Sequence, residues 1–408
     1  MNYGLLGRKL GHSYSPLIHK YLGDYVYKLY EQEPENIGNF LKNTPFSGLN
    51  VTMPYKKDVI TYCSKLSPEA MKLGAVNTIV RQPDGTLIGH NTDYFGFLSM
   101  VKKTGLTIKG KKALVLGSGG ASVTAVAVLE ELGASVVCIS RSGKNNYSNL
   151  NLHWDAALIV NATPVGMYPD TEATPLSLEP FPNLEGVIDL IYNPARTALL
   201  QQAEKRGLIA ENGLWMLVAQ AKESSEWFTG NKLDDTVIPK IHKILSQQVQ
   251  NIVLIGMPGS GKSTVGKLLA QKTGKKFVDA DSHLEQNANM TIPDIFAKYS
   301  ESHFRQLETQ TLSHLGKQSG LVIATGGGCV TRSENYPLLH QNGVLVWLQR
   351  DINSLATDGR PLSQSGQLYQ MYAQRKPLYE SFCDIDVDNN GDPMTTAENI
   401  LQRLKMEV

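Results

Sequence analysis

The sequence predicts an α/β protein built around parallel sheets. Short apolar runs of four or five residues recur along the 408-residue chain and alternate with longer segments of helical periodicity. Most of these runs are continuously apolar, which is typical of parallel strands that are covered on both faces. Glycine-rich turns follow two of them directly. We therefore expect sheets whose strands are connected by helices.

Composition limits the classes of function. The chain is 41% hydrophobic and 19% charged, which excludes a disordered protein. A net charge of +1 gives no field that would favour nucleic acid or a membrane surface as a partner. The four cysteines are far apart and form no CxxC pair, which predicts reduced thiols and a cytoplasmic location. We expect no signal peptide and no membrane span, and the sequence does not indicate the oligomeric state.

The elements fall into three blocks, which we expect to be domains of residues 1–104, 105–248 and 251–408. In the first block we expect strands at Tyr3–Leu6, Tyr25–Tyr30, Gly48–Val51 and Ala75–Arg81, helices at Pro16–Leu22, Glu35–Lys42 and Pro68–Leu73, and a hairpin turn at Gln82–Thr86. In the second we expect strands at Ala113–Leu116, Ser135–Ile139, Ala157–Val160 and Gly186–Leu190.

Two segments of the second block are predicted separately. Residues 143–156 are rich in Asn and Ser and leave little room for a crossover helix, so this connection should be very short or irregular. Asp234–Gln247 carries an apolar stripe of helical spacing and should form a helix shortly before the third block begins at Asn251.

The third block opens with the most specific motif of the chain. Residues 256–264 read Gly-Met-Pro-Gly-Ser-Gly-Lys-Ser-Thr and follow an apolar strand. This is the spacing of a phosphate-binding P-loop, in which glycines let backbone N–H groups wrap an anion at a helix N-terminus. Lys262 would meet the β- and γ-phosphates, and the Ser263 hydroxyl would ligate Mg²⁺. The alternative is an ordinary glycine-rich turn.

A second nucleotide signal lies in the middle block. Gly117-Ser-Gly-Gly-Ala-Ser122 follows a strand and opens the predicted helix Ala121–Leu132, as in a dinucleotide-binding turn, with Ser122 at the third glycine position. The next strand ends in Ser140-Arg141-Ser142, where an acidic residue would indicate NAD. A guanidinium there favours the 2′-phosphate of NADP. A plain strand–helix turn and a solvated arginine are the alternatives.

The first two blocks carry an ordered set of motifs. These are Gly11-His-Ser-Tyr-Ser-Pro16, Asn50-Val-Thr-Met-Pro-Tyr-Lys56, Gly74-Ala-Val-Asn-Thr78, Gly89-His-Asn-Thr-Asp93, Asn161-Ala-Thr-Pro-Val-Gly-Met167, Asp189-Leu-Ile-Tyr-Asn-Pro194 and Leu217-Val-Ala-Gln-Ala221. With them, residues 1–248 closely resemble shikimate dehydrogenase. The resemblance implies a substrate-binding α/β domain followed by a Rossmann-like NADP domain whose last helices return to the first.

The resemblance also implies roles for individual residues. Lys56 and Asp93 match the family's catalytic pair; taken alone, such a pair would more often be a surface salt bridge. The residues implied to bind the substrate are Ser13, Ser15, Thr52, Asn77, Tyr192 and Gln220. Those implied to hold NADP are Gly117, Ser118, Gly119, Gly120, Ala121, Arg141, Asn161, Thr163 and Gly213.

The third block resembles shikimate kinase over residues 251–408. After the P-loop come Asp279-Ala-Asp281, Phe304-Arg305, Gly326-Gly-Gly328, Arg360-Pro361 and Arg375-Lys-Pro-Leu-Tyr379. The resemblance implies a P-loop kinase fold with a parallel sheet. ATP would be bound by Gly259, Ser260, Gly261, Lys262, Ser263, Thr264 and Arg360, Mg²⁺ by Ser263 and Asp279, and shikimate by Asp281, Arg305, Gly327, Gly328 and Arg375, with Lys262 and Asp281 catalytic. Where the family has an arginine upstream of Arg360, this chain has Ile352-Asn353-Ser354.

Together the resemblances imply a bifunctional enzyme. Its first half would reduce 3-dehydroshikimate to shikimate with NADPH, and its second would phosphorylate shikimate with MgATP. One rival interpretation is a single active enzyme fused to a domain that only binds ligand. A narrower one is activity on quinate, or on another small polyol. The pair Arg305 and Arg375 favours a carboxylate substrate over a neutral one.

Overall fold

A computed structural model describes residues 2–11, 13–355 and 368–406 and divides the chain into two compact units. The first comprises Met1–Gly166, Ala173–Tyr192 and Gln202–Ile244, and the second comprises Met167–Glu172, Asn193–Gln201 and Leu245–Val408. The division falls within helix α8 (Val237–Val249), which confirms the helix predicted at 234–247. Among the described residues, no helix is long and apolar enough to span a membrane.

The first sheet is mixed and has the order β2-β1-β3-β5-β6-β4. Its strands are β1 (Asn2–Gly7), β2 (Val26–Glu31), β3 (Gly48–Val51), β4 (Lys65–Leu66), β5 (Thr78–Arg81) and β6 (Leu87–His90). β1 pairs in parallel with β2 and β3, whereas β5 is antiparallel to β3 and forms the predicted hairpin with β6. The helical elements are α1 (Ser15–Leu22), η1 (Pro34–Asn36), α2 (Ile37–Asn43), η2 (Asp58–Tyr62), α3 (Pro68–Leu73) and α4 (Asp93–Thr104).

The strand predicted at Ala75–Arg81 is shorter than expected and begins at Thr78. Helix α3 ends at Gly74, which adopts a left-handed conformation with φ 59°. The next residues bond to two different segments: the Val76 N–H donates to Lys56 O, and the Asn77 N–H donates to His90 O. They therefore do not extend β5. The helix predicted at Glu35–Lys42 likewise divides into η1 and α2.

The second sheet is parallel throughout and has the order β11-β10-β9-β7-β8. Its strands are β7 (Lys112–Leu116), β8 (Ser135–Ile139), β9 (Leu158–Asn161), β10 (Gly186–Asp189) and β11 (Ile209–Glu211), with helical elements α5 (Gly120–Glu131), η3 (Tyr147–His153), α6 (Ala198–Lys205) and α7 (Leu214–Thr229). The crossover at 143–156 contains only η3, a 3-10 helix with non-helical dihedrals at Asn149, as predicted. Helix α7 packs against α4 and α1 of the first sheet's domain.

The second unit contains a parallel sheet of order β13-β14-β12-β15-β16. Its strands are β12 (Asn251–Ile255), β13 (Lys276–Asp279), β14 (Leu321–Ala324), β15 (Gly343–Gln349) and β16 (Ile385–Asp388). Its helical elements are α9 (Lys262–Thr273), α10 (Ala280–Ala288), α11 (Ile292–Lys298), α12 (Glu301–Lys317), η4 (Cys329–Thr331), α13 (Asn335–His340), η5 (Ile352–Ser354), α14 (Leu368–Phe382) and α15 (Pro393–Arg403).

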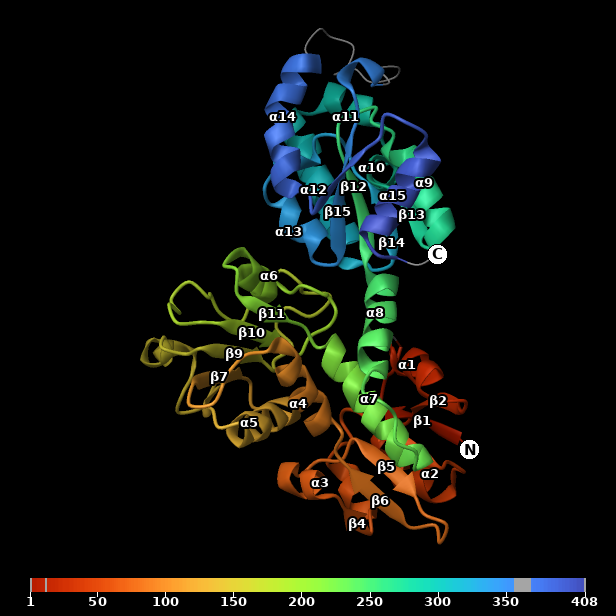
Figure 1. The fold of residues 1–408 in the computed structure, drawn as a ribbon, viewed down its shortest axis with the longest axis vertical. Helices are drawn as coiled ribbons and strands as arrows, with labels where there is room; N and C mark the ends of the chain where they lie inside the picture. Colours follow the sequence, from red (N-terminus) through yellow and green to blue (C-terminus); the bar gives the residue numbers. More distant parts are fainter. Residues whose placement is uncertain (1, 12, 356–367, 407–408) are drawn as a thin grey trace. The chain divides into compact units, whose positions relative to one another are not determined.

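Helices cover both faces of this third sheet (Figure 1). Alternate residues of β12 point to opposite faces, so Val253 and Ile255 join a core with α12, α13 and α14, whereas Ile252 and Leu254 join a core with α9 and α15. The whole strand is therefore buried, which explains its continuously apolar sequence. The loop after β12 is the predicted P-loop, at the carboxyl edge of the sheet.

Candidate active sites

The first site contains the predicted pair of Lys56 and Asp93. Lys56 lies in the loop after β3, and Asp93 is the first residue of α4. The Lys56 Nζ donates to Asp93 Oδ2 at 2.6 Å, and the two side chains are 30% and 18% exposed. The positive N-terminus of α4 stabilises the Asp93 carboxylate. The ion pair is thus half-buried, and its ammonium group remains accessible to a ligand.

Two of the predicted substrate residues, Asn77 and Gln220, meet around Thr92. The Thr92 N–H donates to Asn77 Oδ1 at 2.7 Å, and the Asn77 Nδ2 donates to Thr92 Oγ1 at 3.1 Å. The Thr92 hydroxyl also lies 3.5 Å from Gln220 Oε1. Because Thr92 directly precedes Asp93, these bonds connect both amide side chains to the start of α4. Asn50, the first residue of the motif that ends at Lys56, donates to Thr78 Oγ1 at 3.1 Å and belongs to the same polar cluster, although its sequence pattern predicted no role for it.

The remaining predicted substrate residues lie on neighbouring segments. Ser13 accepts the Ser15 N–H at 3.2 Å, and Ser15 is buried at the first turn of α1. Thr52 follows β3 and donates its N–H to Leu6 O. Tyr192 lies beside Tyr14, with ring centroids 5.7 Å apart, and burial raises the pKa of its phenol. The structure therefore brings Tyr192 next to the Ser13–Ser15 turn.

The predicted dinucleotide turn between β7 and α5 is open to solvent. Ser118, Gly119, Gly120 and Ala121 are all exposed, and a Cβ added to Gly119 or Gly120 would meet no atom within 4 Å. No side chain caps the N-terminus of α5. Backbone N–H groups are thus available to an anion, as a pyrophosphate requires. At the third glycine position the Ser122 hydroxyl donates to Gly117 O at 2.7 Å and closes the turn from within.

Of the other residues predicted to hold NADP, Arg141 is exposed, whereas Asn161 and Gly213 shape the backbone. Arg141 is exposed in the loop after β8. Asn161 is fully buried, and its Oδ1 accepts from the Thr163 N–H and hydroxyl, so its side chain shapes the turn rather than facing a ligand. At Gly213 a Cβ would lie 2.1 Å from Leu190 O. Only glycine therefore allows the two backbone segments to pack this closely.

In the second unit the P-loop has the conformation that its sequence predicts. Gly259 and Gly261 have φ of 82° and 89°. The Lys262 Nζ donates to the carbonyls of Gly256 and Met257, each at 2.9 Å. Thr264 is exposed in the first turn of α9, which no side chain caps. Ser260 is buried, and its Oγ has no hydrogen-bond partner in the described part of the chain, as expected of a group that awaits a phosphate.

The residues predicted to bind Mg²⁺ lie together. The Ser263 hydroxyl donates to Asp279 Oδ2 at 2.7 Å, and Asp279 Oδ1 accepts the N–H groups of Asp281 and Ser282 as the cap of α10. The described residues contain no group of three or more His, Cys, Asp and Glu side chains that would enclose a metal. One carboxylate and one hydroxyl beside a P-loop fit Mg²⁺, which keeps several waters and is otherwise bound by substrate phosphates.

A second cluster lies around the end of β14. Arg305 on α12 donates to Glu308 Oε2 at 2.8 Å and to Glu301 at 3.3 Å. A Cβ on Gly328 would lie 2.2 Å from Arg305 Nη1, and one on Gly326 would lie 2.7 Å from both Asp281 Oδ1 and Glu308 Oε1. Only glycine therefore permits these side chains to approach the strand end.

Burial dominates the electrostatics of this cluster. It raises the pKa of Asp281 to about 6, and the neighbouring charges of Glu308 and Asp279 act in the same direction. Burial also raises the pKa of Glu308, against the opposing effect of Arg305. For Arg305, burial acts to lower the pKa, but Glu308 and Glu301 outweigh it and the net shift is upward. The buried Arg305 and Glu308 and the partly buried Asp281 thus share one small site.

Arg375 reaches the same strand end from α14. Its Nη1 donates to Gly327 O at 3.2 Å, and the Tyr379 hydroxyl donates to the same carbonyl at 2.5 Å. Gly327 itself lies against Pro258 of the P-loop, since a Cβ there would be 2.5 Å from Pro258 Cδ. The glycine segment is therefore in contact with the P-loop as well. Arg360, the remaining residue predicted to bind ATP, lies outside the described residues.

Sequence reasoning missed two supporting residues of the second unit. Glu308 is buried, pairs with Arg305, and has one oxygen, Oε1, without a partner among the described residues. Its spacing of three residues from Arg305 on one helix was an available signal. Asn389 donates to Ser260 O at 2.6 Å and supports the P-loop from the far end of β16. No local pattern indicates that contact, because it depends on the sheet order.

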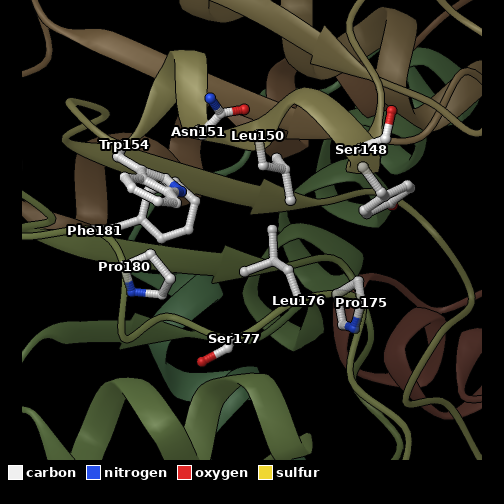
Figure 2. A pocket seen from close by; sticks show the side chains of 10 residues that line it. Ser148, Leu150, Asn151, Trp154, Pro175, Leu176, Ser177, Pro180 and Phe181 are labelled. Atoms are coloured by element: carbon white, nitrogen blue, oxygen red, sulfur yellow. The ribbon is translucent and has the colours of Figure 1, made fainter.

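A pocket of about 420 Å³ lies apart from all these residues, between η3 and the segment before β10. Figure 2 shows the rings of Trp154 and Phe181 at one end of it and Pro175 at the other. None of the predicted site residues that the structure describes lines it, and the lining residues carry no charge. The chemistry predicted from the motifs is therefore not located in this pocket.

Comparisons with known proteins agree with both halves. The family model described as shikimate dehydrogenase substrate binding domain matches residues 5–79, and the model described as shikimate kinase matches residues 258–405. Shikimate dehydrogenase (NADP(+)) of Clostridium beijerinckii is 35% identical over 266 residues, which cover 60% of this chain and 98% of that protein.

Solved structures give the same result. Shikimate 5-dehydrogenase from Thermus thermophilus, in complex with NADP(H) and shikimate, is 33% identical with a TM-score of 0.55, covering 60% of this chain and 99% of that one. A chorismate mutase/shikimate 5-dehydrogenase fusion protein from Clostridium acetobutylicum is 35% identical with a TM-score of 0.57, covering 60% and 97%. The chain thus belongs to the shikimate dehydrogenase family and carries a shikimate kinase domain behind the dehydrogenase.

Proposed function

We propose that this chain is a bifunctional enzyme that reduces 3-dehydroshikimate with NADPH and then phosphorylates the resulting shikimate with MgATP. The observation that carries the proposal is the presence of two separate sites in one chain. One centres on the Lys56–Asp93 ion pair, and the other on the P-loop with Asp281 and Arg305. The product of the first reaction is the substrate of the second, so each assignment supports the other.

In the dehydrogenase site, Lys56 would act as the proton donor. Reduction of a ketone needs a hydride at carbon and a proton at oxygen, and the bound nicotinamide supplies the hydride. The Lys56 ammonium, held 2.6 Å from the Asp93 carboxylate, would donate its proton to the carbonyl oxygen and regain one from solvent. Asp93 would orient the amine throughout.

Recognition in this site follows from the polar groups around the pair. We propose that Ser13, Ser15 and Tyr192 bind the substrate carboxylate and that Thr52, Asn77 and Gln220 bind its hydroxyls. Gly117–Ala121 would receive the pyrophosphate, Arg141 the 2′-phosphate, and the turn shaped by Asn161 and Thr163 together with Gly213 would receive the rest of the cofactor. The open turn at Gly119 and Gly120 supports this placement.

In the kinase site, Asp281 would accept the proton of the attacking hydroxyl. Its carboxylate lies beside Glu308 and close to Gly326, where a polyol could donate hydrogen bonds to both acids. Arg305 and Arg375 would bind the substrate carboxylate through bidentate contacts. Lys262 would neutralise charge on the transferred group, and Ser263 and Asp279 would hold Mg²⁺, which stabilises that charge.

We also propose the assignments that follow from this function. The domains would comprise residues 1–104, 105–248 and 251–408. The four cysteines are free thiols, which agrees with a reducing compartment and supports a cytoplasmic location. The substrates are small molecules, and we propose neither a nucleic acid nor a membrane partner.

Two separate assays test the proposal. One follows NADPH oxidation with 3-dehydroshikimate, and the other follows ADP release from ATP and shikimate. We expect Lys56→Ala to abolish most of the first activity and to leave the second within about twofold, because distant sites behave independently. Lys262→Ala should do the reverse and lower kinase turnover by about a thousandfold. Loss of both activities in either folded variant would contradict the proposal.

A comparison of two substrates tests the placement of the carboxylate. We expect shikimate methyl ester to be a poor substrate of the kinase, since the full ion pair cannot form. Arg375→Leu should reduce turnover of the acid by about 30-fold or more, and turnover of the ester much less. Equal damage to both substrates would show that Arg375 does not act on the carboxylate.

A further inference from the structure

One buried hydroxyl of the first unit contacts three of the segments that carry predicted substrate residues. Ser224 lies on α7 and is fully buried. Its Oγ donates to Gln220 O at 2.9 Å and accepts from Asn50 Nδ2 at 2.7 Å. The hydroxyls of Thr78 and Thr92 each lie 2.9 Å from the same oxygen. Ser224 thus joins α7 to β3, to β5 and to the residue before α4.

The groups that contact Ser224 in turn hold the predicted substrate residues. Asn77 Oδ1 lies within hydrogen-bond distance of the Thr78 hydroxyl, at 3.2 Å, and of the Thr92 hydroxyl, at 3.3 Å. On the other side, Asn50 Oδ1 accepts from the Tyr27 hydroxyl at 2.8 Å. Asn77 and Gln220 therefore both connect to this one oxygen through short chains of bonds.

The hydrogen-bonding capacity of Ser224 makes this arrangement specific. A hydroxyl has one proton to donate and two lone pairs to accept with. The carbonyl of Gln220 takes the proton, and Asn50 and one threonine fill the lone pairs. These bonds satisfy the Ser224 hydroxyl, and a rotation of Asn77 or Asn50 would leave a buried polar atom without a partner, which is costly.

We propose that Ser224 is a positioning residue of the dehydrogenase site, which holds Asn77, and through Thr92 the side chain of Gln220, in the orientation that binds the substrate hydroxyls. The proposal rests on the function proposed above and adds a residue that contacts no substrate. A site whose side chains are already oriented binds its ligand without a further entropic cost of ordering them, so loss of Ser224 should weaken substrate binding selectively.

The chain supplies a matched control one residue further along the same helix. Ser225 is also buried, at 1% exposure, and among the side-chain bonds of the described residues its Oγ accepts only from the Tyr25 hydroxyl, at 2.9 Å. Among the described residues it makes no hydrogen bond to Asn50, Thr78 or Thr92. Replacing either serine with alanine therefore removes one buried hydroxyl from α7, but only Ser224→Ala removes a direct bond to the groups that hold Asn77.

The experiment compares Ser224→Ala and Ser225→Ala in the full chain, in steady-state oxidation of shikimate with NADP⁺. We expect Ser224→Ala to raise the KM for shikimate at least about fivefold and to leave the KM for NADP⁺ within about twofold. Ser225→Ala should leave both within about twofold. Thermal unfolding checks that both variants are folded under the assay conditions, and the unchanged KM for NADP⁺ separates positioning from a general loosening of the fold.

Equal KM values for shikimate in the two variants would overturn the proposal. If Ser224→Ala does not fold, Ser224→Cys takes its place, since a thiol has a similar volume but forms only weak hydrogen bonds. A KM for shikimate equal to that of the native enzyme would then contradict the proposal. A native enzyme that does not oxidise shikimate at all would instead contradict the proposed function, and this is seen before any variant is compared.

Discussion

At the scale of the residue, Asp281 shows how burial prepares a carboxyl group for chemistry. Its pKa is raised to about 6 by burial and by the nearby charges of Glu308 and Asp279. A group that must accept a proton from a hydroxyl works better when its own pKa is closer to neutrality. The kcat/KM of the kinase reports the ionisation of the free enzyme. It should therefore rise as the pH increases through about 6, where Asp281 ionises.

The raised pKa of Asp281 also affects the stability of the fold, which should fall over the same pH range in which the kinase activity rises. The folded-state pKa lies above the ordinary value of 3.8, so the native protein binds this proton more tightly than the unfolded chain does. The stability that this provides is complete below about pH 4 and is lost as the pH rises through about 6. We expect Asp281→Asn to raise the unfolding temperature of the second unit at about pH 7.5 and to lower kinase turnover at least about a hundredfold. A lower unfolding temperature at that pH, measured by calorimetry, would contradict this account.

Arg141 decides the choice of cofactor at the residue scale. Arg141→Asp places a negative charge where the 2′-phosphate should bind, so the KM for NADPH should rise about 10- to 100-fold while the KM for NADH changes much less. Lys144→Asp is a suitable control, because it makes the same change of charge in the same loop. Similar KM values for NADPH in the two variants would show that Arg141 does not contact the cofactor.

At the scale of the element, the glycine segment after β14 admits side chains from two helices. Gly328→Ala would place a methyl group 2.2 Å from Arg305 Nη1 and so displace the guanidinium from its position beside Glu308. We expect a rise of at least about tenfold in the KM for shikimate in the kinase assay, with the dehydrogenase unchanged. Gly391→Ala, where the new methyl group meets nothing within 4 Å, should behave like the native enzyme. No difference between the two variants would mean that Arg305 is not part of the substrate site.

The sequence predicted elements well where one local pattern decides them. Strand β12, helix α8 and the irregular crossover at η3 all follow from local periodicity or composition. The strand predicted from Ala75 begins only at Thr78, because Gly74 ends α3 in a left-handed turn and the next residues bond to Lys56 and His90. Those partners are distant in sequence, and no local pattern encodes them.

The same distinction applies to the sites. Lys56 and Asp93 were predicted as a pair because each lies in a motif, and the structure brings them to 2.6 Å. Glu308, Asn389 and Ser224 lie outside the motifs, and their contacts appear only once helices and strands are packed together. Motifs therefore predict most members of the proposed sites, whereas packing shows which residues support them.

At the scale of the whole molecule, two compact units each contain a set of residues suited to one reaction. The family matches divide in the same way, with dehydrogenase relatives covering 60% of the chain and the kinase model matching residues 258–405. The account therefore predicts two activities that depend on different residues and that follow one another in a single reaction sequence.

A single incubation shows whether one chain carries out both reactions in sequence. The purified chain is supplied with 3-dehydroshikimate, NADPH, ATP and Mg²⁺, and NADPH absorbance and ADP release are followed together. We expect NADPH loss followed by an equal amount of ADP, with shikimate 3-phosphate as the final product, and accumulation of shikimate in the Lys262→Ala variant. ADP release that does not require NADPH, or NADPH loss without ADP release by the native chain, would contradict the claim that one chain carries out both steps.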